Sequence, residues 1–126
     1  RWRAALPAPA PRVEGVALRE ALGRVLAADV LSGVDVPGFD RSNFDGYAVR
    51  AADTYGADDE TPRRLRLNDE ELATGVCPRI AVEAGMATPI ATGGMLPRGA
   101  DAVAMVEQTR LAKDGSLLVT RPIAPG

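Results

Sequence analysis

The sequence predicts an α+β fold that is mainly β, with one N-terminal helix followed by a β-rich lobe of coiled or bifurcated sheets. Two observations lead to this prediction. Apolar residues recur at helical spacing between residues 16 and 28, and the rest of the chain consists of short alternating runs separated by glycine and proline. A chain of 126 residues is long enough to bury a hydrophobic core.

The expected helix covers residues 16–28. Its apolar side chains share one face and its charged side chains lie off that face; the apolar set is Leu18, Ala21, Leu22, Val25 and Leu26. The prolines of residues 6–11 remove backbone donors and indicate a leader or linker. Residues 30–38 alternate and are rich in valine, which predicts a short strand that ends at a Pro-Gly pair.

We therefore expect two parts, a leader, helix and strand in residues 1–38 and a β-rich lobe in residues 39–126. The expected strands of the lobe are residues 47–49, RRLRL as an edge strand with its arginines in water, RIAVEAG, PIATGG, DAVAMVEQ and SLLVT. KDGS predicts a hairpin turn between Leu111 and Leu117. NDEELATGVCP is ambiguous between a helical turn and a loop, and we find no internal repeat.

Composition excludes several classes of function. The 15 basic and 17 acidic residues leave a formal charge of −2 without a basic run, so nucleic acid is not an expected partner. The chain has no histidine and one cysteine, which excludes zinc, iron–sulfur and Ser-His-Asp chemistry. No apolar run reaches the roughly 20 residues of a membrane helix, and we expect a cytoplasmic protein without a membrane partner.

The first candidate site is the loop FDRSNFDGYAV, residues 39–49. Asp40, Ser42, Asn43 and Asp45 offer oxygen acceptors, which suit a hard cation such as magnesium, although the spacing does not match a calcium loop. The alternative is structural: Asp45 and Gly46 form a tight turn, which Asp40 and Ser42 cap through their own backbone amides. Residue types alone favour this structural interpretation.

The second candidate site is the loop IATGGMLPRGAD, residues 90–101. Thr92 precedes Gly93 and Gly94, whose missing Cβ atoms allow a ligand to approach the backbone. The loop lacks the Gly-Lys-Ser/Thr ending of a nucleotide-binding P-loop. A pair of β-turns, with Thr92 bonded to its own backbone, is the structural alternative, and it is again favoured for the loop taken alone.

The two loops together carry a family resemblance. DVPGFDRSNFDGYAVRAADT is followed about forty residues later by PIATGGMLPRGADAVAMVEQT, and LREALGRVLAADV precedes both. This order resembles the N-terminal part of the MoeA/gephyrin family, the molybdopterin molybdenumtransferases, over nearly all of residues 13–126. Asn43-Phe44 and Gly94-Met95 stand where the family often has Ala-Met and Ala-Pro, and the stretch from Asp58 to Leu72 looks longer than usual.

The resemblance implies an enzyme that uses magnesium to insert molybdate into adenylylated molybdopterin. It implies Asp45 and Thr92 as catalytic residues, Asp45 also as a possible magnesium ligand. It further implies a substrate-binding shell made by Asp40, Ser42, Gly46, Gly93 and Gly94. The family forms elongated homodimers, in which residues 1–38 would belong to the linker domain and a pterin-binding α/β domain would follow.

The chain begins with Arg1 and stops after RPIAPG, so we expect an excised piece that lacks the pterin-binding domain and is inactive alone. A non-catalytic dimerisation or protein-binding scaffold is the main alternative. A generic β-rich binding domain is a third, and it would place the two loops far apart.

Overall fold

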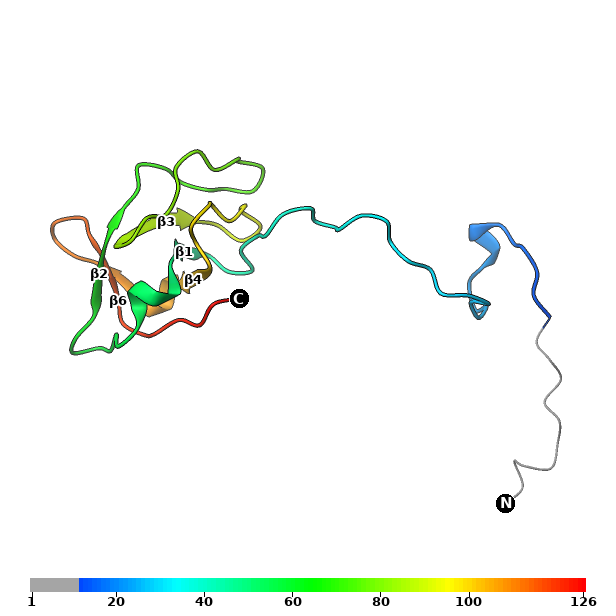
Figure 1. The fold of residues 1–126 in the computed structure, drawn as a ribbon, viewed down its shortest axis with the longest axis horizontal. Coiled ribbons are helices and arrows are strands. Elements are labelled where there is room, and N and C mark those ends of the chain that lie inside the picture. Colours follow the sequence, from blue (N-terminus) through cyan, green and yellow to red (C-terminus); the bar gives the residue numbers. More distant parts are fainter. Residues whose placement is uncertain (1–11) are drawn as a thin grey trace, which may run out of the picture. The chain divides into compact units, whose positions relative to one another are not determined.

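The structure is a computed structural model that describes residues 12–126, and the predicted leader in residues 6–11 lies outside them. The described chain is mainly β (Figure 1). Its elements are η1 (Leu18–Glu20), β1 (Gly46–Val49), η2 (Ala51–Thr54), β2 (Arg63–Leu67), β3 (Met86–Ile90), β4 (Ala102–Met105), η3 (Val106–Gln108), β5 (Thr109–Leu111) and β6 (Leu117–Val119), where η marks a short 3₁₀ helix.

The six strands form one sheet in the order β4-β1-β3-β2-β6-β5. All neighbouring strands are antiparallel except β2 and β3, which run parallel. The predicted strand at residues 47–49 is confirmed as β1, and the predicted hairpin is confirmed because β5 pairs with β6 through Leu111 and Leu117. β1 lies between β3 and β4 (Figure 1). It forms the last part of the first candidate loop and begins directly after Asp45.

β2 is a strand with exposed arginines, as predicted, but it is not an edge strand. Its first half pairs with β6, from Arg63 to Leu65, and its second half pairs with β3, at Arg66 and Leu67. One strand is thus shared between two groups of strands, which curls the sheet around the buried Leu65. The edge prediction was wrong because alternation shows only that one face is exposed and contains no information about what lies beside the strand.

The core is small and aliphatic. One cluster joins Val49 of β1, Leu65 of β2 and the two buried β6 residues, Leu117 and Val119. A second cluster joins Ala48, Leu72 and Ile90 and lies beneath the candidate loops. These clusters fix the strand ends from which both loops project.

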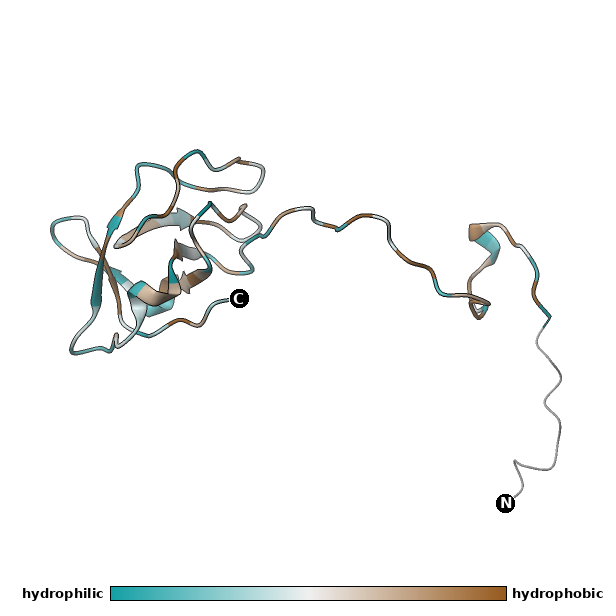
Figure 2. Cartoon of the chain, viewed as in Figure 1, coloured by the Kyte–Doolittle hydropathy of each residue, from teal (hydrophilic) through white to brown (hydrophobic). Residues whose placement is uncertain are grey.

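The predicted helix at residues 16–28 is wrong. Only Leu18–Glu20 is helical, as one 3₁₀ turn without a buried residue. None of the apolar residues of the predicted face is buried, and Leu22 is 97% exposed. Figure 2 shows apolar residues spread along this extended stretch. A helix of this length is marginal in water unless its apolar face is covered, and none of residues 12–35 covers it.

The strands predicted at residues 30–38 and in RIAVEAG are also absent. Residues 30–38 are exposed and pair with no described strand. The first two residues of RIAVEAG, Arg79 and Ile80, donate their backbone N–H groups to the Glu70 carboxylate. Val82 of the same segment donates its N–H to the carbonyl of Arg98. A side chain and a turn therefore take donors that a strand ladder would use.

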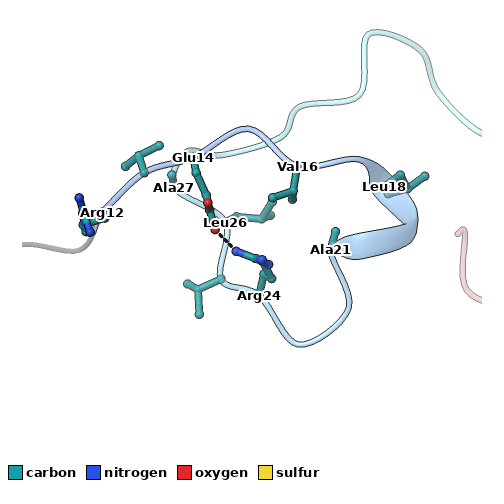
Figure 3. A pocket seen from close by; sticks show the side chains of 10 residues that line it. Arg12, Glu14, Val16, Leu18, Ala21, Arg24, Leu26 and Ala27 are labelled. Carbon is teal, nitrogen blue, oxygen red and sulfur yellow. Dashed lines mark hydrogen bonds and ion pairs between the residues drawn. The ribbon is translucent and has the colours of Figure 1, made fainter.

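The chain divides into two units between Asp35 and Val36. The first unit contains a hollow lined by residues between Arg12 and Ala27, in which Arg24 forms an ion pair with Glu14 (Figure 3). None of the predicted site residues lies there; all belong to the second unit.

Among residues 12–126, no helix has the length and apolar character needed to span a membrane.

Candidate functional site

The two candidate loops lie side by side. Ser42 donates its backbone N–H to the carbonyl of Gly94 at 2.9 Å, and Gly93 donates its N–H to the carbonyl of Ser42 at 2.8 Å. Leu96 donates to the carbonyl of Asp40 at 2.8 Å, which extends the pairing by a further bond. The predicted loops therefore form one structure, contrary to the expectation for a generic domain with accidental motifs.

Asp45 and Thr92 meet directly across this pairing. The Thr92 backbone N–H donates to Asp45 Oδ1 at 2.7 Å, and the Thr92 hydroxyl donates to the same oxygen at 2.8 Å. The two residues are 47 positions apart in the chain. The structure thus joins the two residues predicted to be catalytic, and no described residue donates to Asp45 Oδ2.

These bonds also set the charge of the site. The Thr92 backbone N–H, followed by its hydroxyl, lowers the pKa of Asp45 below its ordinary value, and the small desolvation of the carboxylate opposes this shift. Both donors stabilise the ionised carboxylate more than the neutral acid. Asp45 is therefore a carboxylate at neutral pH and does not serve as a proton donor there.

The structural interpretation of the first loop holds for Ser42 but not for Asp45. The buried Ser42 hydroxyl accepts the Phe44 N–H at 3.2 Å and donates to the Phe44 carbonyl. Asp45 instead crosses to the second loop through its side chain, and its carbonyl accepts the Val106 N–H at 3.2 Å. Asp40 takes part through its backbone carbonyl. Ser42 therefore shapes the turn that presents Asp45.

Two of the predicted glycines are required by close packing within the chain. A Cβ on Gly46 would lie 2.1 Å from the Ala104 carbonyl oxygen of the neighbouring strand β4. A Cβ on Gly94 would lie 2.5 Å from the Leu72 carbonyl oxygen and 2.8 Å from Ile90 Cγ1. These distances are too short for any side chain, so the close approach at both positions is between parts of this chain.

A third loop, residues 72–76, completes the site and was not predicted. Leu72 forms a parallel bridge with Ile90, and its carbonyl accepts the Ala91 N–H at 3.0 Å. Two positions further on, the Thr74 hydroxyl donates to the Thr92 carbonyl at 2.9 Å. The sequence contains a signal for this arrangement, because Ala-Thr-Gly occurs at both 73–75 and 91–93.

An open hollow of about 470 Å³ lies beside Asp45. Its lining includes Asp45, Tyr47 and Glu71, together with Pro89 and Val106. Glu71 and Leu72 end the long stretch that begins at Asp58, so this stretch reaches the site. In the part of the chain that the structure describes, no three acidic or cysteine side chains gather into a metal-binding group.

The donor set is compatible with a magnesium ion that is held mainly by other molecules. Asp45 Oδ2 is open to a cation, and Mg²⁺ is often bound by one or two carboxylates together with water and substrate phosphates. Asp45 therefore fits as a single carboxylate ligand. When bound, such an ion supplies compensating positive charge to phosphate oxygens.

The geometry places a carboxylate, a hydroxyl and several backbone groups together at the end of a curled β-sheet. Comparison with known proteins shows the family of the chain. The family model described as MoeA N-terminal region (domain I and II) matches residues 1–126. The molybdopterin molybdenumtransferase of Bacillus subtilis is 43% identical over 97 residues, which is 77% of this chain and 22% of that protein. The Nostoc protein of the same name is 38% identical over 109 residues, 86% of this chain and 25% of that one.

A solved structure agrees with these sequence relatives. The crystal structure of the molybdopterin biosynthesis moeA protein from Pyrococcus horikoshii matches with a TM-score of 0.80 and 43% identity, covering 90% of this chain and 29% of that one. The chain belongs to the MoeA N-terminal region family. The mainly β prediction and the family assignment are confirmed, and the chain spans about a quarter of the length of these curated relatives.

Proposed function

We propose that this chain forms part of the site of a molybdopterin molybdenumtransferase, which inserts molybdate into adenylylated molybdopterin during molybdenum cofactor biosynthesis. The support is the family membership together with the names of relatives such as those from Bacillus subtilis and Nostoc. The chain covers only part of those proteins, so the pterin substrate would be bound mainly by residues outside it.

The direct Asp45–Thr92 contact is the observation that carries this proposal. In the proposed site, Asp45 orients magnesium or a water molecule through its open oxygen, and Thr92 interacts with an oxyanion of molybdate or phosphate. Asp45 is not proposed as a general acid, because its lowered pKa keeps it ionised at neutral pH. The two residues act by positioning and by charge.

The remaining predicted residues would form the supporting shell. Ser42 and Gly93 hold the two loops together through the 2.8 Å bond between them, and Asp40 adds its carbonyl. Gly46 and Gly94 permit the close packing of β1 and of the loop around Leu72. We propose that the substrate meets this backbone surface from the side of Asp45 and Thr92.

We further propose that the active protein is a cytoplasmic homodimer and that the present chain has no transferase activity alone. The incomplete coverage of the relatives supports the second part of this proposal. A turnover assay of the isolated chain checks it. Release of AMP with a molybdenum-loaded pterin from this chain alone would overturn it.

Substitution of the two central residues in the full-length gene product tests the proposed function. Asp45→Asn and Thr92→Val should each lower kcat for molybdenum insertion by about 100- to 1,000-fold, the range expected when a preorganised polar group is removed. Circular dichroism and the Tm serve as folding controls. If both variants insert molybdenum at the unsubstituted rate, the enzyme proposal fails for this site and the scaffold alternative takes its place.

A further inference from the structure

The repeated Ala-Thr-Gly sequence forms two similar turns. In the first, Val76 donates its N–H to the carbonyl of Ala73 at 3.1 Å; in the second, Gly94 donates to the carbonyl of Ala91 at 2.9 Å. The third residue of each turn is a glycine with positive φ, 86° at Gly75 and 81° at Gly93. Positive φ at this position is typical of a type II turn, with threonine at the second position.

The two turns are in register. Leu72 bridges Ile90 in parallel orientation one residue before each Ala-Thr-Gly, and Thr74 then contacts Thr92. The contact is between the Thr74 hydroxyl and the Thr92 carbonyl, at 2.9 Å. Thr74 Oγ1 also lies 2.9 Å from the position of a Cβ on Gly93, so the turns are closely apposed.

This contact holds one particular peptide group. Type I and type II turns differ mainly by a flip of their central peptide, which here joins Thr92 to Gly93. Thr74 binds the carbonyl end of that peptide, and the Ser42 carbonyl binds its N–H end at 2.8 Å. Both ends of the peptide are therefore fixed by different loops.

We infer that Thr74 is a positioning residue, whose hydroxyl holds the Thr92–Gly93 peptide and so restrains, from its carbonyl side, the threonine whose N–H and hydroxyl donate to Asp45. The expected effect of Thr74 on molybdenum insertion rests on the proposed function. Its expected effect on the conformation of the turn at residues 91–94 does not. Thr74 does not touch Asp45 through any hydrogen bond in residues 12–126, so it acts through Thr92.

The first test is kinetic and uses the full-length gene product. Thr74→Val removes the hydroxyl while preserving shape, and it should lower kcat for molybdenum insertion about three- to tenfold, the range for one neutral hydrogen bond. KM should stay within about twofold, because the uniform binding of substrate is unchanged. Thr74→Ser retains the hydroxyl and should restore kcat to within about twofold of the unsubstituted protein.

The control is Thr120→Val, since Thr120 also donates its hydroxyl to a backbone carbonyl, that of Gln108, at 3.1 Å. This substitution should leave kcat unchanged. This test applies when Asp45→Asn and Thr92→Val lower kcat. In that case, an unchanged kcat in Thr74→Val, or a kcat that Thr74→Ser fails to restore, would overturn the effect of Thr74 on turnover.

The second test does not depend on activity. Amide hydrogen exchange measured by NMR should accelerate about three- to tenfold at Thr92 and Gly93 in Thr74→Val, with normal exchange in Thr74→Ser. If Asp45→Asn and Thr92→Val retain full turnover, the proposed function fails and this exchange measurement alone decides the positioning role. Unchanged exchange at both amides in Thr74→Val would refute that role.

Discussion

Residues 12–35 and residues 36–126 have similar apolar patterns but differ in whether the apolar side chains are buried. Both contain regularly spaced apolar residues, yet Leu22 in the first part is 97% exposed and Leu72 in the second is fully buried. The difference lies in the neighbours. Ala48 of β1 and Ile90 of β3 cover Leu72, whereas none of residues 12–35 covers Leu22. Regular spacing places apolar side chains on one face of an element, but that face stabilises the fold only when another surface packs against it.

Truncating these two leucines should give the largest contrast. Leu72→Ala should lower the free energy of unfolding by about 2 to 5 kcal/mol, because it leaves a cavity beneath the site. Leu22→Ala should change it by less than about 0.5 kcal/mol. Urea denaturation of both variants measures the difference, and equal losses would show that the first part is packed in solution.

A pair of glycines gives the next contrast. Gly46→Ala should destabilise by about 3 kcal/mol, because its Cβ would overlap the Ala104 carbonyl and separate β1 from β4. Gly33→Ala is the control, since a Cβ there meets no atom within 4 Å. Its free energy of unfolding should stay within about 0.5 kcal/mol of the unsubstituted value. A stable Gly46→Ala variant would mean that the β1–β4 pairing adapts.

Gly94→Ala sharpens the comparison within the second part. The Cβ of an alanine here would lie 2.5 Å from the Leu72 carbonyl oxygen. We expect a loss of about 1 to 3 kcal/mol in the free energy of unfolding. Thermal unfolding followed by circular dichroism tests this. An unchanged Tm would show that the loop at residues 72–76 moves away without cost.

The smallest expected effect is on the pH dependence of stability. Because folding lowers the pKa of Asp45, its contribution is present above the ordinary aspartate pKa of about 3.9 and is lost as pH falls through the lowered value. Asp45→Asn keeps an acceptor for Thr92 but cannot ionise. The Tm of the unsubstituted chain should therefore fall more between pH 6 and pH 3 than that of the variant. Parallel Tm profiles would contradict the lowered pKa.

Local patterns predicted the strands better than they predicted the helix. Alternation and turn residues sufficed for β1 and for the β5–β6 hairpin, because tight turns bring neighbouring strands together. The helix at residues 16–28 required a surface that a local pattern cannot supply. The interior position of β2 likewise depends on β3 and β6, which follow it in the chain.

For the site, the sequence predicted the residues but not all of their contacts. The family resemblance singled out Asp45 and Thr92, and the structure joins them. Residue types alone favoured separate turns, because a bond across 47 positions has no local signature. Thr74 was missed because its segment looked like an ambiguous loop, although the second Ala-Thr-Gly at 91–93 marked it.

The bond from the Thr92 hydroxyl to Asp45 has a consequence for the order in which ligands bind. A hydroxyl carries one proton, and in this structure that proton is committed to Asp45 Oδ1. An oxyanion that accepts the same proton must take it from the carboxylate, whose Oδ1 then keeps only the bond from the Thr92 backbone N–H. Anion and cation would in this way each favour the binding of the other, because the carboxylate loses a donor that competes with the cation for its negative charge.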